Sequence, residues 1–282
     1  MKLQIIIIQK SLAEDCFNYY IFGGAVKEKR SKARLSADKR IKEITLLAEL
    51  IIVKRGFKEL TLQEVIEQSS ISRGTFFKLI PNKETLIAHL GVKGINSWLE
   101  LINKTQNFEG LAREKLLILH ASQVITSKLN RITYHSIFIA NAELNRLAVA
   151  SELNLILDDR VNELIQFYNS CIQLGIKEGS FPAKDYLLNT EELAYFMWAN
   201  RYGATVCNIN YTPHNNDSDL SSKYKKFVDM HLDSMEWRPL SNEVNYGRVL
   251  LDIYNQFYKK EVAQVKKLAL EDNLPSITQQ EF

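Results

Sequence analysis

The chain has 282 residues, of which 46% are hydrophobic, and it carries a formal net charge of +3 at pH 7. This size and composition allow a substantial buried core and predict two domains, while no apolar run approaches the roughly 18–20 residues that span a bilayer. The three cysteines (Cys16, Cys171 and Cys207) are too sparse for a disulfide framework or a zinc site, as is typical of a reducing cytoplasm. We expect them to act as small buried apolar residues.

Patterns typical of catalysis are missing from the sequence. It contains no glycine-rich phosphate loop, no HExxH zinc motif and no nucleophile elbow. His214 lies near Asp217 and Asp219, which could hold a metal ion, but a solvated loop explains this polar segment more simply. We therefore expect no enzymatic activity, no catalytic residues, no cofactor and no metal site.

Two apolar segments occupy the first 26 residues. Residues 3–8 are apolar, but Gln9 and Lys10 end this run too early for a signal peptide with its cleavage site. Residues 17–26 are apolar and aromatic and end in a glycine pair. Two interpretations stand: the true start of the chain lies downstream, or these residues form an additional element that packs on the body.

Residues 27–42 form a strongly basic segment, with eight basic and two acidic residues. Residues 1–90 carry +6 in total (sixteen Lys and Arg against ten Asp and Glu), whereas residues 91–282 carry −3 (twenty against twenty-three). A basic arm ahead of a DNA-binding unit can lie along phosphates or enter the minor groove. The alternative is a disordered solubilising segment, and the helices that follow favour the arm.

Residues 39–90 contain the start and stop patterns of four short helices in quick succession. The first shows apolar residues at i, i+3 and i+4 spacing, and the second begins with a capping box of Thr61 and Glu64. The third should cover residues 73–80. The expected helix caps are Ser36, Thr61, Ser72 and Asn82, and the expected helix ends are marked by Gly56 and Pro81.

The second and third helices are joined by a turn of three residues, 70–72, which is typical of a helix-turn-helix. In the third helix Arg73 can pair with guanine, and Gly74 allows the backbone to approach DNA closely. Solvated surface residues on a three-helix core are the alternative explanation, which the ordered caps and basic flank disfavour. The predicted DNA-binding residues are Thr61, Ser72, Arg73, Gly74, Thr75, Phe77, Lys78 and Lys83.

This stretch resembles the DNA-binding domain of the TetR (tetracycline-repressor-like) family of bacterial regulators. The resemblance implies a homodimer on a palindromic DNA operator, a separate all-helical ligand-binding domain, and repression that a small molecule usually releases. The matching residues are Arg55-Gly56-Phe57, Thr61, Ile66, Ile71-Ser72-Arg73-Gly74-Thr75-Phe76-Phe77 and Pro81-Asn82-Lys83-Glu84-Thr85-Leu86.

Four residues depart from the family pattern. Phe77 replaces a common tyrosine, and Leu79 replaces a frequent tyrosine or histidine, so neither can donate a hydrogen bond to a phosphate. Ser70 replaces the usual turn glycine, and Glu67 a usual alanine. A second interpretation therefore stays open, in which the chain keeps the fold as a ligand- or protein-binding module but has lost sequence-specific DNA binding.

Beyond residue 90 the helical pattern continues, with the fourth helix leading into the body. Glycines and Phe181-Pro182 should close the helix that ends near residue 178. The later helices are expected near residues 109–129, 131–146, 147–178, 189–209 and 218–235. By resemblance, the last two form the four-helix bundle of a dimer, although packing within one chain is an equal alternative. The candidate interface residues are Trp198, Tyr202, Gly203, Met230 and Leu232.

The C-terminal part exceeds the common family length. Residues 237–240 read as a turn, residues 245–270 as one amphipathic helix and residues 271–282 as a frayed polar end. This helix could cover the body or the dimer seam.

A ligand site should lie among the body helices, where large apolar side chains with polar tips suit a drug-sized or acyl ligand. Core packing is the alternative explanation for aromatic residues at helical spacing. The candidate ligand-binding residues are Trp98, His120, Tyr134, His135, Phe138, Phe167, Tyr168 and Phe196.

Together these patterns predict an all-α protein: an N-terminal three-helix helix-turn-helix domain followed by a larger helical ligand-binding and dimerisation domain. The expected parts are an N-terminal extension (1–26), the basic arm with the helix-turn-helix (27–90), the body (91–240) and an extra helix with a tail (241–282). The expected partners are double-stranded operator DNA, an unknown small-molecule effector and a second copy of the chain, in the cytoplasm at the nucleoid and without a membrane.

Overall fold

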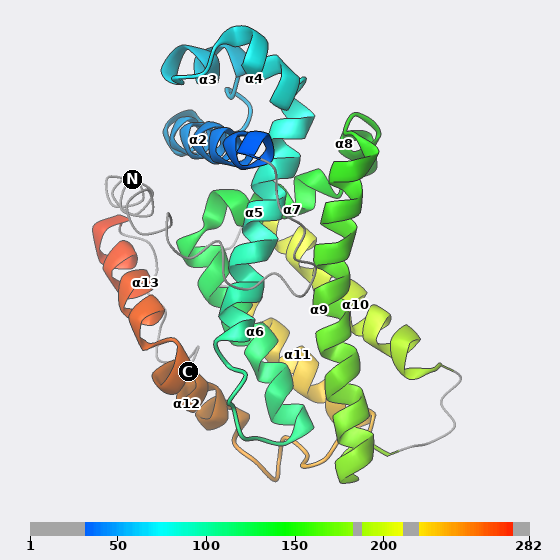
Figure 1. The fold of residues 1–282 in the computed structure, drawn as a ribbon. Coiled ribbons are helices and arrows are strands. Elements are labelled where there is room, and N and C mark those ends of the chain that lie inside the picture. The colour runs from blue at the N-terminus through cyan, green and yellow to red at the C-terminus, as the bar shows by residue number, and fades with distance from the viewer. Residues whose placement is uncertain (1–31, 183–187, 211–219, 273–282) are drawn as a thin grey trace.

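The computed structural model describes residues 32–182, 188–210 and 220–272, which form helices and no strand (Figure 1). The predicted all-α class is confirmed. Predictions that concern residues 1–31, 183–187, 211–219 and 273–282 lie outside the described residues, including the N-terminal extension and the loop around His214. Within the described part, no helix is both long enough and apolar enough to cross a membrane.

Four helices build one end of the molecule. They are α2 (Lys32–Arg55), α3 (Leu62–Gln68), α4 (Arg73–Leu79) and the start of α5 (Lys83–Asn103), which leads from this end into the body (Figure 1). Their apolar faces meet in a small core. The buried residues of the small core are Ile44, Ala48, Ile51, Ile52, Leu60, Val65, Ile71, Phe76, Ile80, Leu86 and Leu90.

Local capping groups fix the ends of these short helices. Gly56 follows α2 with φ +87°, a left-handed conformation that side chains rarely adopt. Thr61 accepts the backbone N–H of Glu64 at 3.3 Å, and Asn82 accepts a backbone N–H of α5 at 2.7 Å. These predicted caps are confirmed, but the Glu64 carboxylate pairs with Arg55 at 3.2 Å instead of completing a capping box.

Two other cap predictions need correction. α2 begins at Lys32, so Ser36 lies inside the helix and does not cap it; the preceding residues are good helix formers that extend it. Ser72 does occupy the N-cap position of α4, but its hydroxyl donates to the side chain of Thr75 at 3.0 Å and makes no capping bond to the backbone.

The body contains α6 (Ala112–Leu129), α7 (Arg131–Ala140), α8 (Glu143–Leu147) and α9 (Ser151–Glu178). The single helix expected over residues 131–146 is therefore wrong, because two helices replace it.

The break between α7 and α8 has a local cause. The side-chain amide of Asn141 donates to the Ile137 carbonyl at 2.8 Å, and the backbone N–H of Asn141 donates to the same oxygen at 3.2 Å. Asparagine side chains compete in this way with the helical hydrogen bonds that would continue the helix.

The chain ends in α10 (Thr190–Asn210), α11 (Leu220–Ser234), α12 (Tyr246–Phe257) and α13 (Lys259–Asp272). The single helix expected over residues 245–270 is also wrong, since the chain breaks between α12 and α13.

Tyr258 explains this second break. Its ring is fully buried, and its hydroxyl donates to the Leu101 carbonyl of α5 at 2.8 Å. An ion pair between Lys104 and Glu261 holds the start of α13 against the end of α5. These contacts with α5 thus break the helix at a point where the apolar periodicity of the sequence alone would continue it.

A large core fills the body, and α5 contributes to both cores, with Leu86 and Leu90 in the small core and Ile95 and Trp98 in the large one. α5 packs closely on α7 because glycine faces that helix: a Cβ atom on Gly94 would lie 2.3 Å from a backbone oxygen of α7. α5 is therefore a continuous helix that packs in both cores and connects the two ends of the molecule.

The cysteine prediction is only partly right. Cys171 is buried in the large core, and burial raises the pKa of its thiol to about 12. Cys207 is exposed on α10, so it does not serve as a buried apolar residue, and Cys16 lies outside the described residues.

Candidate DNA interface and ligand cavities

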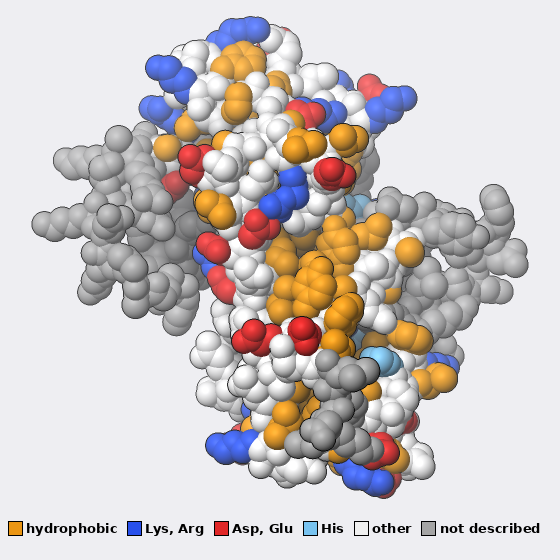
Figure 2. All heavy atoms as spheres, turned by 90° about the vertical axis from the view of Figure 1, so that its right-hand side faces the viewer, with side chains coloured by type: hydrophobic (Ala, Val, Ile, Leu, Met, Phe, Trp, Pro, Cys, Tyr) orange, Lys and Arg blue, Asp and Glu red, His pale blue; other side chains and the backbone are white. Residues whose placement is uncertain are grey.

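The outer surface of α3 and α4 carries the predicted DNA-binding residues. Basic side chains gather around this end of the molecule (Figure 2). Most of the predicted residues are exposed, namely Thr61, Ser72, Arg73, Gly74, Phe77 and Lys78, whereas Thr75 and Lys83 are half-buried. Six of the eight belong to α4 or its N-cap, whereas Thr61 caps α3 and Lys83 begins α5.

Arg73 is held between α3 and α4. Its guanidinium donates to Gln63 at 2.8 Å and lies over the ring of Phe77 at 5.4 Å from the centroid. Gln63 in turn donates to Glu67 at 2.7 Å. Sequence reasoning missed Gln63, whose position one turn before Glu67 on an exposed helix face could have indicated it.

The departures from the family pattern have clear structural outcomes. Leu79 packs against the small core, so it adds apolar contact where a polar tip was expected. Phe77 stays 37% exposed beside Arg73. Ser70 donates its backbone N–H and its hydroxyl to Glu43 of α2, at 2.8 and 2.9 Å, which fixes the turn without a glycine.

Lys83 has a role that the sequence did not indicate. Its ammonium donates to the backbone carbonyls of Phe57 and Lys58, at 2.9 and 3.3 Å. It therefore closes the turn between α2 and α3, whereas Lys78 is exposed on α4 and better suited to a phosphate.

The end of the molecule that contains α3 and α4 is connected to the body through α8 and the residue that follows it. The side chain of Asn82 donates to the Ala148 carbonyl at 2.8 Å, and Asn145 of α8 donates to the Glu84 carbonyl at 3.4 Å. These bonds connect the first turn of α5 to the segment between α7 and α9.

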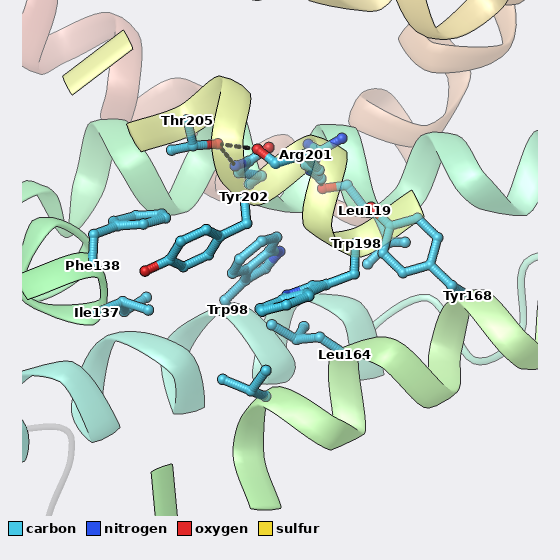
Figure 3. Close-up of a pocket in the computed structure, with 12 residues that line it drawn as sticks. Trp98, Leu119, Ile137, Phe138, Leu164, Tyr168, Trp198, Arg201, Tyr202 and Thr205 are labelled. Atoms are coloured by element: carbon cyan, nitrogen blue, oxygen red, sulfur yellow. Dashed lines mark hydrogen bonds between the residues drawn. The ribbon is translucent and has the colours of Figure 1, made fainter. Parts of the chain in front are cut away.

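One cavity lies between α5, α6, α7, α9 and α10, with about 420 Å³ of open space that includes its mouth (Figure 3). We name it the aromatic cavity. Its walls include Trp98, Phe138, Tyr168, Trp198, Arg201 and Tyr202. Apolar walls with few polar groups are typical of a small-molecule site. The aromatic side chains leave only narrow space between them, so a small molecule would enter only if they move apart.

The polar groups of this region are held by specific hydrogen bonds. The amide of Gln123 donates to the hydroxyls of Tyr134 and Thr205 at 2.6 and 2.8 Å, and the indole of Trp98 donates to Ser122 at 2.9 Å. These bonds orient the wall between α5, α6 and α10.

Three of the predicted ligand residues, Trp98, Phe138 and Tyr168, line the aromatic cavity. Tyr134 is buried beside it, with its ring 5.2 Å from that of Phe138 and 6.2 Å from that of Trp98. His120 lines a second cavity.

The remaining candidates lie outside the walls of both cavities. They are His135, Phe167 and Phe196, of which Phe196 is 55% exposed. Aromatic spacing alone does not say which face of a helix points inward, and so these assignments are not supported.

Residues of α10 that sequence reasoning assigned to a dimer interface lie in the cavity wall. Trp198 and Tyr202 stack at 5.2 Å, and Tyr202 contacts Phe138 at 5.1 Å. Leu232 is 3% exposed in the large core, which does not fit an interface role, whereas Met230 is 70% exposed. Gly203 is exposed as well.

The second cavity lies between α6, α10, α11 and α12, with about 360 Å³ of open space that includes its mouth. We name it the basic cavity, because its walls contain Arg113, Arg201 and Lys225 together with one acidic residue, Asp229. Burial, and then the nearby cations of Arg201 and Lys225, lower the pKa of His120 to about 3. His120 is therefore neutral at pH 7.

Across the described ranges, no group of three or more His, Cys, Asp and Glu side chains is placed to hold a metal ion.

No family model matches the chain, and no curated protein matches it in sequence. Solved structures do match. A TetR-family regulatory protein from Rhodococcus RHA1 is 17% identical, with a TM-score of 0.50, over 69% of this chain and 96% of its own. A transcriptional regulator from Saccharomonospora viridis in complex with choline is 17% identical, with a TM-score of 0.52, over 68% of this chain and 96% of its own.

A TetR-family transcriptional regulator from Syntrophomonas wolfei gives a similar result: 16% identity and a TM-score of 0.50, over 69% of this chain and 95% of its own. At such identities the likeness concerns the arrangement of helices. The chain therefore has the fold of TetR-family transcriptional regulators.

Proposed function

We propose that this protein is a DNA-binding transcriptional regulator of the TetR family, a dimeric repressor that a small molecule releases from a palindromic operator. The observation that carries the proposal is the exposed first turn of α4, where Arg73 and Gly74 stand on a helix-turn-helix that α5 joins to a cavity-bearing body. The regulators with the same fold support it.

DNA reading follows from the chemistry of this surface. A recognition helix presents its first turn to base edges, and Arg73 can pair bidentately with guanine once it leaves Gln63. Nothing lies within 4 Å of the position of a Cβ atom on Gly74, so the backbone there is open to a close approach by DNA. Lys78 is the candidate phosphate contact.

A second copy supplies the symmetry that a palindrome requires. Exposed apolar side chains on α10 and α11 support self-association: Tyr195, Phe196, Phe227 and Met230 are between 48% and 70% exposed. Figure 2 shows hydrophobic side chains gathered on the face that includes α9 and α10. Water-exposed patches of this kind are typical of interaction surfaces.

Ligand control follows from the shared helix. Trp98 of α5 lines the aromatic cavity, while Leu86 and Leu90 of α5 belong to the small core under α3 and α4. α7 lies between them, since Phe138 faces the cavity and Ile132 packs on the small core. A ligand that shifts α5 or α7 would therefore move the DNA-binding end.

A module that has lost sequence-specific DNA binding is the second candidate. Leu79 and Lys83 favour it, because one packs into the small core and the other closes a turn, and both leave the phosphate contacts weaker.

Selection of genomic fragments by the purified protein at about 50 and about 200 mM salt separates the two candidates, because phosphate contacts make DNA affinity steeply salt-dependent. Enrichment of a palindrome that survives the higher salt would establish a specific regulator. Binding without a shared motif, lost at the higher salt, would contradict the regulator proposal and support the second candidate.

A further inference from the structure

The short helix α8 and the start of α9 expose three leucines to solvent. Leu144 and Leu147 of α8 are 83% and 77% exposed, and Leu155 of α9 is 60% exposed. Leu144 and Leu147 are three residues apart, so they lie on the same side of α8. We name these three side chains the leucine patch. Leucine side chains left in water to this extent favour burial against a partner.

Polar contacts hold the start of α9 beside α8. The guanidinium of Arg146 pairs with the carboxylate of Asp158 at 2.8 Å, and the amide of Asn154 donates to the Arg146 carbonyl at 2.9 Å. Leu155 follows Asn154 and is therefore turned by about 100° around α9, to the flank next to α8. Figure 2 views the molecule from the side of α8 and α9 and shows hydrophobic and acidic side chains next to one another at this level. The three leucines thus belong to one surface.

The surface around the leucine patch is acidic. Residues 143–163 contain five acidic and two basic residues, which gives a net charge of −3. Both arginines, Arg146 and Arg160, pair with acids of the same segment. Three further acids of this segment are exposed and pair with no lysine or arginine of the described part: Glu143, Glu152 and Asp159.

These charges restrict what can cover the leucine patch. Carboxylates repel the phosphates of DNA and of anionic lipids. The same patch of a second copy would place acids against acids, which opposes a contact between two identical patches. The surface therefore suits an apolar protein segment that carries positive charge.

The chain itself contains such a segment directly before α2. Residues 17–26 are apolar and aromatic, and residues 27–31 contain three basic residues and one acidic residue. α2 packs on α7, which α8 follows, and in Figure 1 the N-terminal end of α2 points to the side of the molecule that carries α8. Five extended residues span up to about 17 Å, more than the diameter of a helix, so residues 17–26 can cross α7. We propose that residues 17–31 dock on the leucine patch of the same chain.

Docking within one chain is favoured because the segment is covalently attached to α2, which raises its local concentration above that of a free partner. The site also has a structural consequence. The side chain of Asn82 donates to the Ala148 carbonyl, and Asn145 donates to the Glu84 carbonyl, so α8 is already connected to the first turn of α5. The docked segment connects the start of α2 to the same place. Both ends of the four-helix unit are then fixed to α8.

The test uses Cys16, the native cysteine directly before this segment. In a Cys207→Ser background the other native thiol is Cys171, which is buried with its pKa raised to about 12 and so does not react. Ser151→Cys places a thiol on the first residue of α9, and Gln173→Cys places one on the same helix about 33 Å away. The whole chain is treated with a short bismaleimide, and linked cysteines are identified by mass spectrometry. We expect Cys16 to link to position 151 of its own chain at least roughly tenfold faster than to position 173.

Further substitutions distinguish docking from the effect of the covalent attachment alone. Leu147→Asn should slow the link to position 151 roughly fivefold or more, because apolar contact is lost. Glu152→Lys should slow it as well, because the basic residues are then repelled. Leu270→Asn is the matched control, since Leu270 is 81% exposed on α13, and it should leave the rate unchanged. An unchanged rate in Leu147→Asn, or the same loss in Leu270→Asn, would overturn the proposal.

Two other results would also overturn it. Links between two chains would show that a second copy covers the leucine patch, and equal or absent linking at positions 151 and 173 would show that residues 17–31 do not dock there. These measurements contain no DNA and no small molecule, so their outcome is independent of the proposed function.

Discussion

The two ends of this molecule bury polar groups in different ways. The small core under α2, α3 and α4 is made of apolar side chains, and the polar side chains buried at this end are small or paired: Thr45 and Thr85 are short, and Glu49 pairs with Lys93 at 2.6 Å. The body encloses Arg113, His120, Gln123 and Arg201 among its packed helices. An apolar core gives the helix-turn-helix end one stable shape, whereas enclosed polar groups supply the hydrogen-bonding groups of the proposed ligand site in the body.

The largest effect should come from breaking the joint between the two ends. In Gly94→Val the new Cβ would lie 2.3 Å from the Thr133 carbonyl, so α5 and α7 must separate. We expect the free energy of unfolding to fall by about 3 kcal/mol or more, measured by urea denaturation. Gly203→Ala is the control, since nothing lies within 4 Å of its Cβ position; a similar loss there would contradict the steric explanation.

Acid should weaken the protein through a histidine in each region. Burial lowers the pKa of His89 to about 4, and burial with nearby cations lowers that of His120 to about 3. Their ordinary pKa is about 6.5, so between pH 6.5 and pH 4 the unfolded chain binds more protons. Stability is complete above pH 6.5 and falls as the pH decreases, on the order of 2 kcal/mol for each residue.

The measurement is the free energy of unfolding at pH 7 and pH 4.5 for the wild type, His89→Gln and His120→Gln. Each variant should lose less stability on acidification than the wild type. Imidazole NMR signals assigned to His89 or His120 that titrate near pH 6.5 in the folded protein would contradict the buried, neutral state.

Two variants of α4 should distinguish a residue that contacts bases from one that contacts phosphates, by their effects on DNA affinity. Arg73→Ala should weaken binding to the selected operator roughly tenfold to a hundredfold, and binding to random DNA much less. Lys78→Ala should weaken both alike. Competition binding at fixed salt provides the numbers, and equal losses on both DNAs for Arg73→Ala would refute its base-reading role.

The smallest effect is expected from a substitution that adds a hydrogen-bond donor at position 77. Phe77→Tyr places a hydroxyl on an exposed ring beside Arg73, where it can reach a phosphate. We expect DNA affinity to rise by a few-fold, about 1 kcal/mol at most, with a steeper salt dependence. An unchanged salt dependence would mean that position 77 lies away from the DNA backbone.

The sequence was sufficient where structure is local. Gly56, Thr61 and Asn82 act within a few residues of their own positions, so their capping roles could be read directly. Tyr258 could not be assigned in this way, because the break that it makes depends on the Leu101 carbonyl, far away in the sequence.

The cavity walls could not be predicted from the sequence for the same reason, since they depend on contacts between distant segments. Their walls combine five helices in one case and four in the other, and helical spacing does not reveal which face turns inward. Phe196 and Trp198 are two positions apart on α10, yet the first faces solvent and the second lines the aromatic cavity. Arg201 was missed because a charged residue next to aromatic ones reads as surface until the packing is known.

The glycine contact between α5 and α7 also sets a lever length. Gly94 lies eleven residues from Lys83, the first residue of α5, so about 16 Å of helix extends from this contact to the helix-turn-helix end. A tilt of about 5° at Gly94 would displace that end by about 1.4 Å over this length. In a symmetric pair both recognition helices would shift, away from the spacing of about 34 Å that successive major grooves impose. Small rotations at one glycine could therefore decide whether two distant helices fit DNA together.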